Sequence, residues 1–150
     1  MKARKTLLFD GAVKGNPDSS GVGGVIKNAD GRIESRYAWG VGFNSSIQAE
    51  TLALLQDLKL LISLGIKDAI IFGDSQSIIK AMVDKSSPSD LRLSRLLRRI
   101  RVLTNTFQNL EFLHVKRENN KEADVEANKA VLLSPGALLR DGDEGWDPIP

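Results

Sequence analysis

The segment Lys5–Pro17 places a carboxylate directly after a short apolar run, and this arrangement restricts the possible folds more than any other part of the sequence. Residues 6–9 predict a buried strand, whereas Asp10-Gly11 predicts a turn or a widened loop. A buried strand that ends in an acid brings that acid to the rim of a sheet. We therefore expect a sheet in which Asp10 lies at an accessible rim, with glycine leaving room for an approaching group.

The remaining sequence predicts a mixed sheet covered by helices. Residues 21–26 and 32–43 predict two further strands that form an antiparallel meander with the first, because a turn signal joins them at 28–31. The elements predicted after this meander are helix 48–64 starting at Ser45-Ser46, strand 68–73, helix 76–83, helix 91–103, strand 110–117 and a helix starting at Asn119-Asn120. Alternating strands and helices after a meander indicate the α/β class. The last helix carries a narrow small-residue face suited to close packing, formed by Ala123, Ala127, Ala130 and Val131.

The length and the residue pattern predict one domain. A chain of 150 residues can bury a core of ordinary size. The pattern lapses after Ser134-Pro135-Gly136, so we expect a domain at 1–134 and an extended or disordered C-terminal tail at 135–150. The sequence contains no secretion signal and no apolar run of membrane length, which favours an intracellular location, cytoplasmic or nuclear, and no membrane partner. We expect a monomer for the isolated domain.

Cysteine and histidine usage limits the kinds of metal site. There is no cysteine and only one histidine, so disulfides and thiolate sites are excluded and oxygen ligands remain. Oxygen ligands favour Mg²⁺ or Mn²⁺ over zinc.

Positive charge is concentrated in one helix. The net charge is only +2, yet five arginines lie between Asp90 and Leu103 with one acid. This segment predicts a basic amphipathic helix, and two interpretations of it remain open. It either contacts phosphates of a nucleic acid, an interaction that weakens with salt, or it is a solvated face opposite a leucine stripe.

Four carboxylates occur in settings that could bring them together. Asp10 and Asp74 each follow a buried strand, and these positions are adjacent if the two strands are parallel neighbours. Glu50 and Asp124 lie in the first turns of two helices. Taken singly, each acid has an ordinary explanation as a turn, a helix cap or a surface charge.

A cluster of four acids indicates metal binding. Carboxylates within a few ångströms of each other repel strongly, and cations relieve that repulsion. Two Mg²⁺ ions about 3.5–4 Å apart could bridge one phosphate, one activating a water and the other stabilising the leaving 3′ oxygen. The predicted chemistry is cleavage of a phosphodiester backbone.

Four strings in this order resemble type 1 ribonuclease H: FDGAVKGNP, QAETLALLQDL, GDSQSIIKAM and RENNKEADVEANKA. The resemblance covers about Thr6 to Leu133. It implies a ribonuclease H-like five-stranded mixed sheet of order 3-2-1-4-5 flanked by helices, two Mg²⁺ ions for which Mn²⁺ can substitute, and cleavage of the RNA strand of RNA/DNA hybrids to 5′-phosphate and 3′-hydroxyl ends. The metal ligands and catalytic acids it implies are Asp10, Glu50, Asp74 and Asp124.

The resemblance also implies substrate contacts. Asn16 and Gln76 match positions used at the RNA 2′-hydroxyl and backbone, the group that distinguishes RNA from DNA. Asn44, Ser45 and Ser46 match the segment that contacts the DNA strand. We add Gly11 to the expected substrate-binding set.

The chain departs from the bacterial pattern at two places. His114 lies ten residues before Asp124, where bacterial members carry a mobile histidine, but it falls inside an alternating apolar pattern and is predicted to be a strand residue. The short loop at 117–120 is similar to the compact archaeal and retroelement branch, which implies an auxiliary catalytic role for Arg117. The alternatives are that Arg117 pairs with Glu118 or Glu122, or that Glu118 takes the auxiliary role. The bacterial basic loop has no counterpart after the helix that ends at residue 83.

Three functions are compatible with these features. The first is a hybrid-specific endoribonuclease, either standing alone or as the ribonuclease H domain of a retrotransposon polyprotein. The second is a hybrid-binding module without catalysis, which the presence of all four acids disfavours. The third is another nuclease or a transposase on the same fold, a class that usually lacks the first and third strings together.

Overall fold

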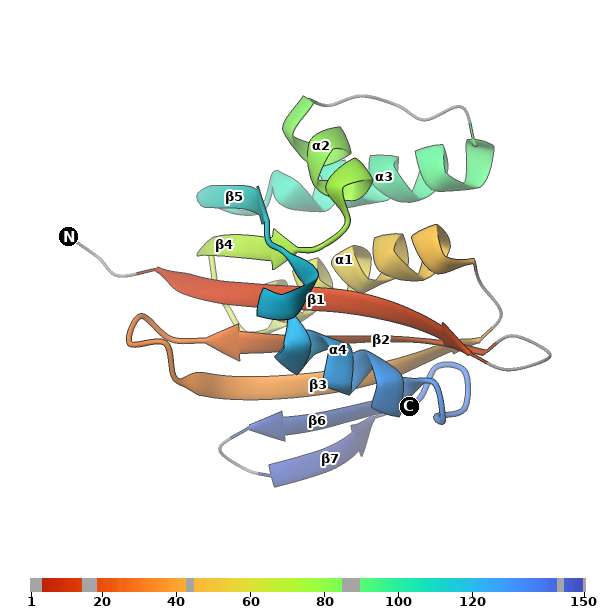
Figure 1. Ribbon diagram of the computed structural model, residues 1–150. Helices are drawn as coiled ribbons and strands as arrows, with labels where there is room; N and C mark the ends of the chain where they lie inside the picture. The colour runs from red at the N-terminus through yellow and green to blue at the C-terminus, as the bar shows by residue number, and fades with distance from the viewer. Residues whose placement is uncertain (1–3, 15–18, 43–44, 85–89, 143–144, 150) are drawn as a thin grey trace.

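The computed structural model describes residues 4–14, 19–42, 45–84, 90–142 and 145–149. These residues form one sheet and its covering helices (Figure 1). The elements, in chain order, are β1 (Lys5–Lys14), β2 (Ser19–Lys27), β3 (Ile33–Gly42), α1 (Ser46–Ser63), β4 (Asp68–Gly73), α2 (Gln76–Asp84), α3 (Leu91–Thr104), β5 (Asn109–His114), the 3₁₀ helix η1 (Arg117–Asn119), α4 (Lys121–Ala130), β6 (Leu138–Gly142) and β7 (Gly145–Ile149).

The sheet is mixed, and its order is β5-β4-β1-β2-β3-β6-β7. Strands β1, β2 and β3 form the antiparallel meander, while β4 pairs in parallel with both β1 and β5. The predicted fold class and the predicted order of the first five strands are confirmed. Two strands that the sequence pattern did not indicate, β6 and β7, extend the sheet beyond β3 as an antiparallel pair. The division of the chain at residue 134 stays a prediction.

The predicted turn at Asp10-Gly11 is wrong. Strand β1 continues through both residues to Lys14, because β2 remains its antiparallel partner along the whole length. The parallel pairing with β4, in contrast, ends where Phe9 faces Gly73. Asp10 is therefore the first β1 residue beyond the end of β4, so the acid reaches a rim of the sheet without a turn.

The predicted strand 110–117 is too long at its C-terminal end. Strand β5 ends at His114, which faces Gly73 at the end of β4, and the next amide, that of Val115, makes a last hydrogen bond to the Gly73 carbonyl. With no further β4 backbone to pair with, residues 117–119 turn into η1.

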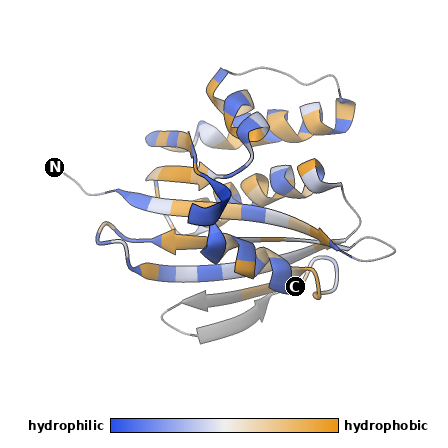
Figure 2. Ribbon diagram, viewed as in Figure 1, coloured by the Kyte–Doolittle hydropathy of each residue, from blue (hydrophilic) through white to orange (hydrophobic). Residues whose placement is uncertain are grey.

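Helices cover both faces of the sheet. Figure 1 shows α4 in front of the central strands, with α1 on the opposite face. The buried core lies between the sheet and α1 and includes Leu7, Phe9, Leu54 and Leu58. In Figure 2 the strand β4 and the buried part of β1 are mainly hydrophobic.

The small-residue face predicted for the last helix is confirmed. Ala123, Ala127 and Ala130 are fully buried where α4 packs on β2. Gly23 of β2 makes this close packing possible, because a Cβ there would lie 2.4 Å from the Ala127 nitrogen. Helix α4 therefore lies almost on the strand backbone, which fixes the position of its first turn.

Helix α1 starts at the predicted Ser45-Ser46, and both α1 and α3 have a side-chain cap. The Ser45 hydroxyl accepts a hydrogen bond from the Gln48 amide, and the Gln48 side chain accepts one from the Ser45 amide, which forms a capping box. Asp90 caps α3 through the Leu93 amide. Leu93, Leu96 and Leu97 of α3 are buried, and four of its arginines are exposed, as a basic amphipathic helix requires: Arg92, Arg95, Arg98 and Arg99. None of the helices in the described ranges is long and apolar enough to cross a membrane.

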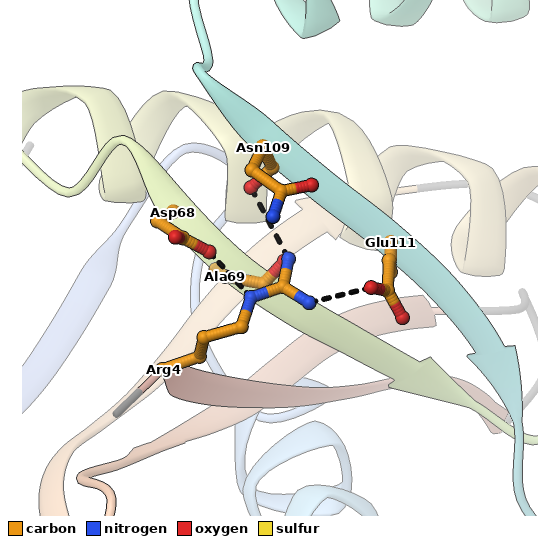
Figure 3. A network of polar contacts seen from close by, with 5 residues as sticks. All are labelled: Arg4, Asp68, Ala69, Asn109 and Glu111. Atoms are coloured by element: carbon orange, nitrogen blue, oxygen red, sulfur yellow. Dashed lines mark hydrogen bonds and ion pairs between the residues drawn. The ribbon is translucent and has the colours of Figure 1, made fainter. Parts of the chain in front are cut away.

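Arg4 ties the N-terminal ends of the parallel strands together (Figure 3). Its guanidinium forms ion pairs with Asp68 and with Glu111, the second at 2.6 Å. It also donates to the Ala69 carbonyl at 3.0 Å and the Asn109 carbonyl at 3.3 Å. One side chain thus joins the start of β1 to β4 and β5, at the end of these strands opposite Asp10.

Asp57 is an unusual core residue that yields a test of the fold. It is fully buried in α1, and neither carboxylate oxygen has a hydrogen-bond partner among the described residues. Burial raises the pKa of Asp57 well above its ordinary value. The folded protein therefore holds a proton that the unfolded chain releases above about pH 4, so stability falls as pH rises through this range.

Replacing Asp57 with alanine should stabilise the protein, because a buried polar group without a partner costs roughly 1–3 kcal/mol. We expect Asp57→Ala to raise the free energy of unfolding by about 1 kcal/mol at pH 8 and by less at pH 5. Urea denaturation at both pH values measures this, with the exposed Asp84→Ala as the control. An equal gain at the two pH values, or a loss at pH 8, would contradict the assignment.

Candidate active site

Asp10 is a buried acid on the central strand of the sheet. Its side chain is only 5% exposed, and one of its oxygens accepts a hydrogen bond from the Gly11 amide at 2.9 Å. Burial, the charge of Asp74 and an interaction with Asp124 raise the pKa of Asp10 to about 6, against the lowering effects of Glu50 and the Gly11 amide. Asp10 thus interacts, by direct contact or through charge, with all three of the other predicted acids: Glu50, Asp74 and Asp124.

Glu50 reaches Asp10 because α1 passes very close to β1. A Cβ at Gly11 would lie 2.8 Å from both the Ala49 carbonyl carbon and the Glu50 nitrogen, a distance that side chains do not tolerate. Only glycine at position 11 lets the first turn of α1 come this near. The glycine assigned to substrate binding from the sequence therefore has a structural function here, and its contact with substrate stays a prediction.

Three acids form a tight cluster where the pairing of β1 with β4 stops and α1 begins. One carboxylate oxygen from each of Asp10, Glu50 and Asp74 lies within 4.8 Å of the other two. The pKa of Glu50 rises to about 10, mainly through burial and then through the hydrogen bond and charge of Asp10. The cluster therefore holds a proton at neutral pH when nothing else compensates its charge.

Asp124 adjoins the cluster from the opposite face of the sheet. It lies in the first turn of α4, is exposed, and reaches the others through its interaction with Asp10. The four acids thus come from β1, from α1, from the residue that follows β4 and from α4, and one oxygen from each of the first three lies within 4.8 Å of the others.

The cluster fits a divalent cation with a preference for oxygen ligands. All donors are carboxylates, which suits Mg²⁺, Mn²⁺ or Ca²⁺ rather than a thiolate-seeking or imidazole-seeking metal. The Glu50 Oε2 atom is buried and has no hydrogen-bond partner among the described residues, as expected of a ligand atom. A cation would also remove the repulsion that raises the pKa values of Asp10 and Glu50.

Asn120 belongs to the site although the sequence pattern did not single it out as a functional residue. It is fully buried, and its side-chain amide donates to the Phe9 carbonyl at 2.9 Å and to Asp74 Oδ2 at 3.2 Å. The only signal in the sequence was its place at the start of the last helix, four residues before Asp124. That place also suits an ordinary helix cap, so the sequence pattern did not distinguish a capping residue from a residue of the site.

Of His114 and the auxiliary candidate Arg117, only His114 makes a hydrogen bond to a residue of this cluster among the described residues. His114 is the last residue of β5, as predicted, and its Nε2 atom lies 3.2 Å from the Asp74 backbone oxygen. Arg117 is exposed in η1, and within the described ranges no ion pair joins it to Glu118 or Glu122. Glu122 pairs instead with Lys27 at 2.7 Å.

The predicted substrate contacts are only partly described. Gln76 is exposed at the first position of α2, two residues after Asp74. Ser45 and Ser46 are exposed at the start of α1. Asn16 and Asn44 lie outside the described residues.

Comparisons with known proteins agree on one family. A family profile described as reverse transcriptase-like matches residues 8–130. Ribonuclease HI of Halobacterium salinarum is 35% identical over 128 residues, which are 85% of this chain and 64% of the relative. A bifunctional protein of Mycobacterium tuberculosis is 28% identical over 137 residues, 89% of this chain and 37% of the relative. The chain thus spans less than two thirds of the length of these curated relatives.

Solved structures are similar over almost their whole length. The crystal structure of RNase H1 from Halobacterium salinarum superposes with a TM-score of 0.80 at 34% identity, covering 85% of this chain and 97% of that one. The structure of LC11-RNase H1 in complex with an RNA/DNA hybrid superposes with a TM-score of 0.79 at 26% identity, covering 85% and 96%.

A methyl group at position 11 should disturb the cluster. In Gly11→Ala the added carbon displaces α1, so we expect a loss of about 1–3 kcal/mol in stability and weaker Mg²⁺ binding. Denaturation and calorimetric Mg²⁺ titration measure the two effects. The matched control is Gly31→Ala, whose Cβ meets nothing within 4 Å but is strained by a φ of +82°. The control should lose stability and keep its Mg²⁺ affinity. Unchanged stability and affinity in Gly11→Ala would contradict the packing described.

Cation binding should release protons from the cluster. Carboxylates bind metal in their ionised form, and the pKa of Glu50 is about 10 in the metal-free protein. At pH 8 we therefore expect Mg²⁺ to displace about one proton, and affinity should fall further below pH 6, where Asp10 is also protonated. Titration calorimetry in buffers of different ionisation enthalpy counts the protons. Glu50→Gln should release none, and the absence of any release from the wild type would refute the protonated state of Glu50.

Proposed function

This chain belongs to the reverse transcriptase-like family and has the fold of type 1 ribonuclease H, and on that premise we propose that it is a metal-dependent endoribonuclease. Its substrate is the RNA strand of an RNA/DNA hybrid, and its products carry 5′-phosphate and 3′-hydroxyl ends. The observation that carries the proposal is the cluster of Asp10, Glu50 and Asp74 at one rim of the sheet. The names of the relatives, ribonuclease HI and RNase H1, support the same activity.

The four acids are assigned to metal binding. Asp10, Glu50, Asp74 and Asp124 would hold two Mg²⁺ ions, for which Mn²⁺ can substitute. When bound, such ions supply charge stabilisation at a phosphate and an acidified water. The chain itself contributes the positions of the carboxylates, since Asp10, Glu50 and Asp124 lie on β1, α1 and α4 and Asp74 directly follows β4.

Substrate recognition is assigned to the exposed surface around the cluster. Gln76 follows Asp74 closely and Ser45-Ser46 precede Glu50 closely, so all three lie near the acids along the chain. We place Gly11, Asn16 and Asn44 in the same set from the sequence motifs. Four exposed arginines of α3 offer phosphate contacts, which would make binding independent of base sequence and weaker at high salt.

Two finer assignments complete the proposal. Arg117 is exposed in η1, three residues before Asn120, and is assigned an auxiliary role in catalysis. The reverse transcriptase-like family and the compact loop at 117–120 support an origin in a retrotransposon polyprotein, in which such a domain would remove the RNA template.

The proposal is tested with labelled RNA/DNA hybrid, duplex RNA and duplex DNA, each with Mg²⁺ or with EDTA. We expect cleavage of the hybrid alone and none in EDTA. Asp74→Asn removes one metal ligand and should lower the rate about a thousandfold, because the cations contribute several kcal/mol at about 1.36 kcal/mol per factor of ten. The control Asp84→Asn, an exposed acid at the end of α2, should retain the wild-type rate.

Two outcomes would overturn the proposal. Tight binding of the hybrid without cleavage in Mg²⁺ or Mn²⁺ would indicate a hybrid-binding module on the same fold. Equal cleavage of duplex DNA would indicate another class of nuclease.

A further inference from the structure

The buried amide of Asn120 joins three of the elements that carry the acids. Its nitrogen donates to the carbonyl of Phe9, the residue directly before Asp10, and to the carboxylate of Asp74. Its backbone oxygen accepts a hydrogen bond from the amide of Asp124 at 3.1 Å. A single residue therefore contacts the β1 backbone beside the first acid, the third acid directly and the backbone of the fourth.

The local role expected of this residue does not account for these contacts. Asn120 occupies the position before the first residue of α4, where asparagine often caps a helix with its side-chain oxygen. Here the side chain makes no capping hydrogen bond. Its oxygen is buried without a partner among the described residues, while its nitrogen makes both contacts to the site. The amide is thus oriented by Phe9 and Asp74 and not by the helix.

The chemistry of the side chain fits this position. Two acceptors, a backbone carbonyl and a carboxylate, need two hydrogens from one group, and a neutral amide supplies them. A carboxylate at position 120 would have the same shape, but it would donate nothing and would add charge beside acids that already repel each other.

We infer that Asn120 is a positioning residue that holds the Asp74 carboxylate in place relative to Asp10 and α4 before a cation binds. This inference deepens the proposed function, since it assumes that the acids are the cation ligands. Groups that hold metal ligands in place typically change metal affinity or activity by about 10–100-fold when they are replaced. We expect an effect of that size here, through the arrangement of the acids and not through contact with the substrate.

The test is Asn120→Asp, which exchanges only the donor amide for a carboxylate of the same shape. We expect the dissociation constant for Mg²⁺, measured by calorimetry without substrate, to rise about 10–100-fold. With hybrid substrate, kcat should fall by a similar factor while KM changes by less than about twofold, because a positioning residue acts on the acids. The control is Asn119→Asp, which places the same charge on the neighbouring exposed residue of η1 and should leave Mg²⁺ affinity within about twofold of the wild type.

A folded Asn120→Asp protein with wild-type Mg²⁺ affinity and kcat would overturn the inference, even if it were less stable. A second measurement applies if this variant does not fold. In the wild type, the side-chain NH₂ signals of Asn120 should exchange slowly with solvent and shift when Mg²⁺ is added, and Asp74→Asn should speed their exchange. Rapid exchange and unchanged shifts would overturn the inference on their own.

The outcomes also separate this inference from the proposed function. If the wild type binds Mg²⁺ in an Asn120-dependent manner but cleaves no hybrid, the positioning role stands and the assigned activity fails. If it cleaves hybrid and Asn120→Asp does so equally well, the activity stands and the positioning role fails.

Discussion

The structure depends on the burial of two acids side by side, Asp10 and Glu50. The two residues are 5% and 9% exposed. Burial raises the pKa of Asp10 to about 6, and burial together with the hydrogen bond and charge of Asp10 raises the pKa of Glu50 to about 10. An arrangement of this kind is unfavourable unless something compensates the charge. The metal-free protein compensates with a proton on Glu50, and a divalent cation would do so without that proton. The contact between Asp10 and Glu50 is therefore unfavourable for the metal-free fold and favourable for the proposed cation binding.

The rest of the fold holds this contact in place. Two glycines act on opposite faces of the sheet: Gly11 lets α1 approach β1, and Gly23 lets α4 approach β2. The end of β4 opens the rim beyond Phe9, so Asp10 projects where its parallel neighbour has stopped. At the other end of the same strands Arg4 joins β1, β4 and β5 through ion pairs and carbonyl contacts. The parallel strands are thus fixed at both ends, and the acids lie at the end where the helices begin.

Local sequence patterns predicted the helices and the first five strands. The features that they missed depend on contacts between residues far apart in the sequence. Periodicity and capping residues placed the helices and the first five strands, and the resemblance to type 1 ribonuclease H is confirmed by the family match and the superposed structures. The continuation of β1 through Asp10 depends on β2, and the pair β6–β7 depends on the edge of β3, neither of which a local pattern contains. Asn120 was missed for the same reason: its partners are 111 and 46 residues away in the sequence. The three clustered acids were found because Asp10 follows a recognisable apolar run, Asp74 follows a strand end and Glu50 lies near a helix start.

The proposed cation site consists of two buried acids, Asp10 and Glu50, and the partly buried Asp74. The most direct measurement is a crystal structure of the protein grown with Mn²⁺, with the ion located by its anomalous scattering. We expect an anomalous peak at coordination distance from all three carboxylates, with the Glu50 Oε2 atom among the ligands. The absence of a peak at this rim at saturating Mn²⁺, with Glu50 still protonated and hydrogen-bonded to Asp10, would rule out the site.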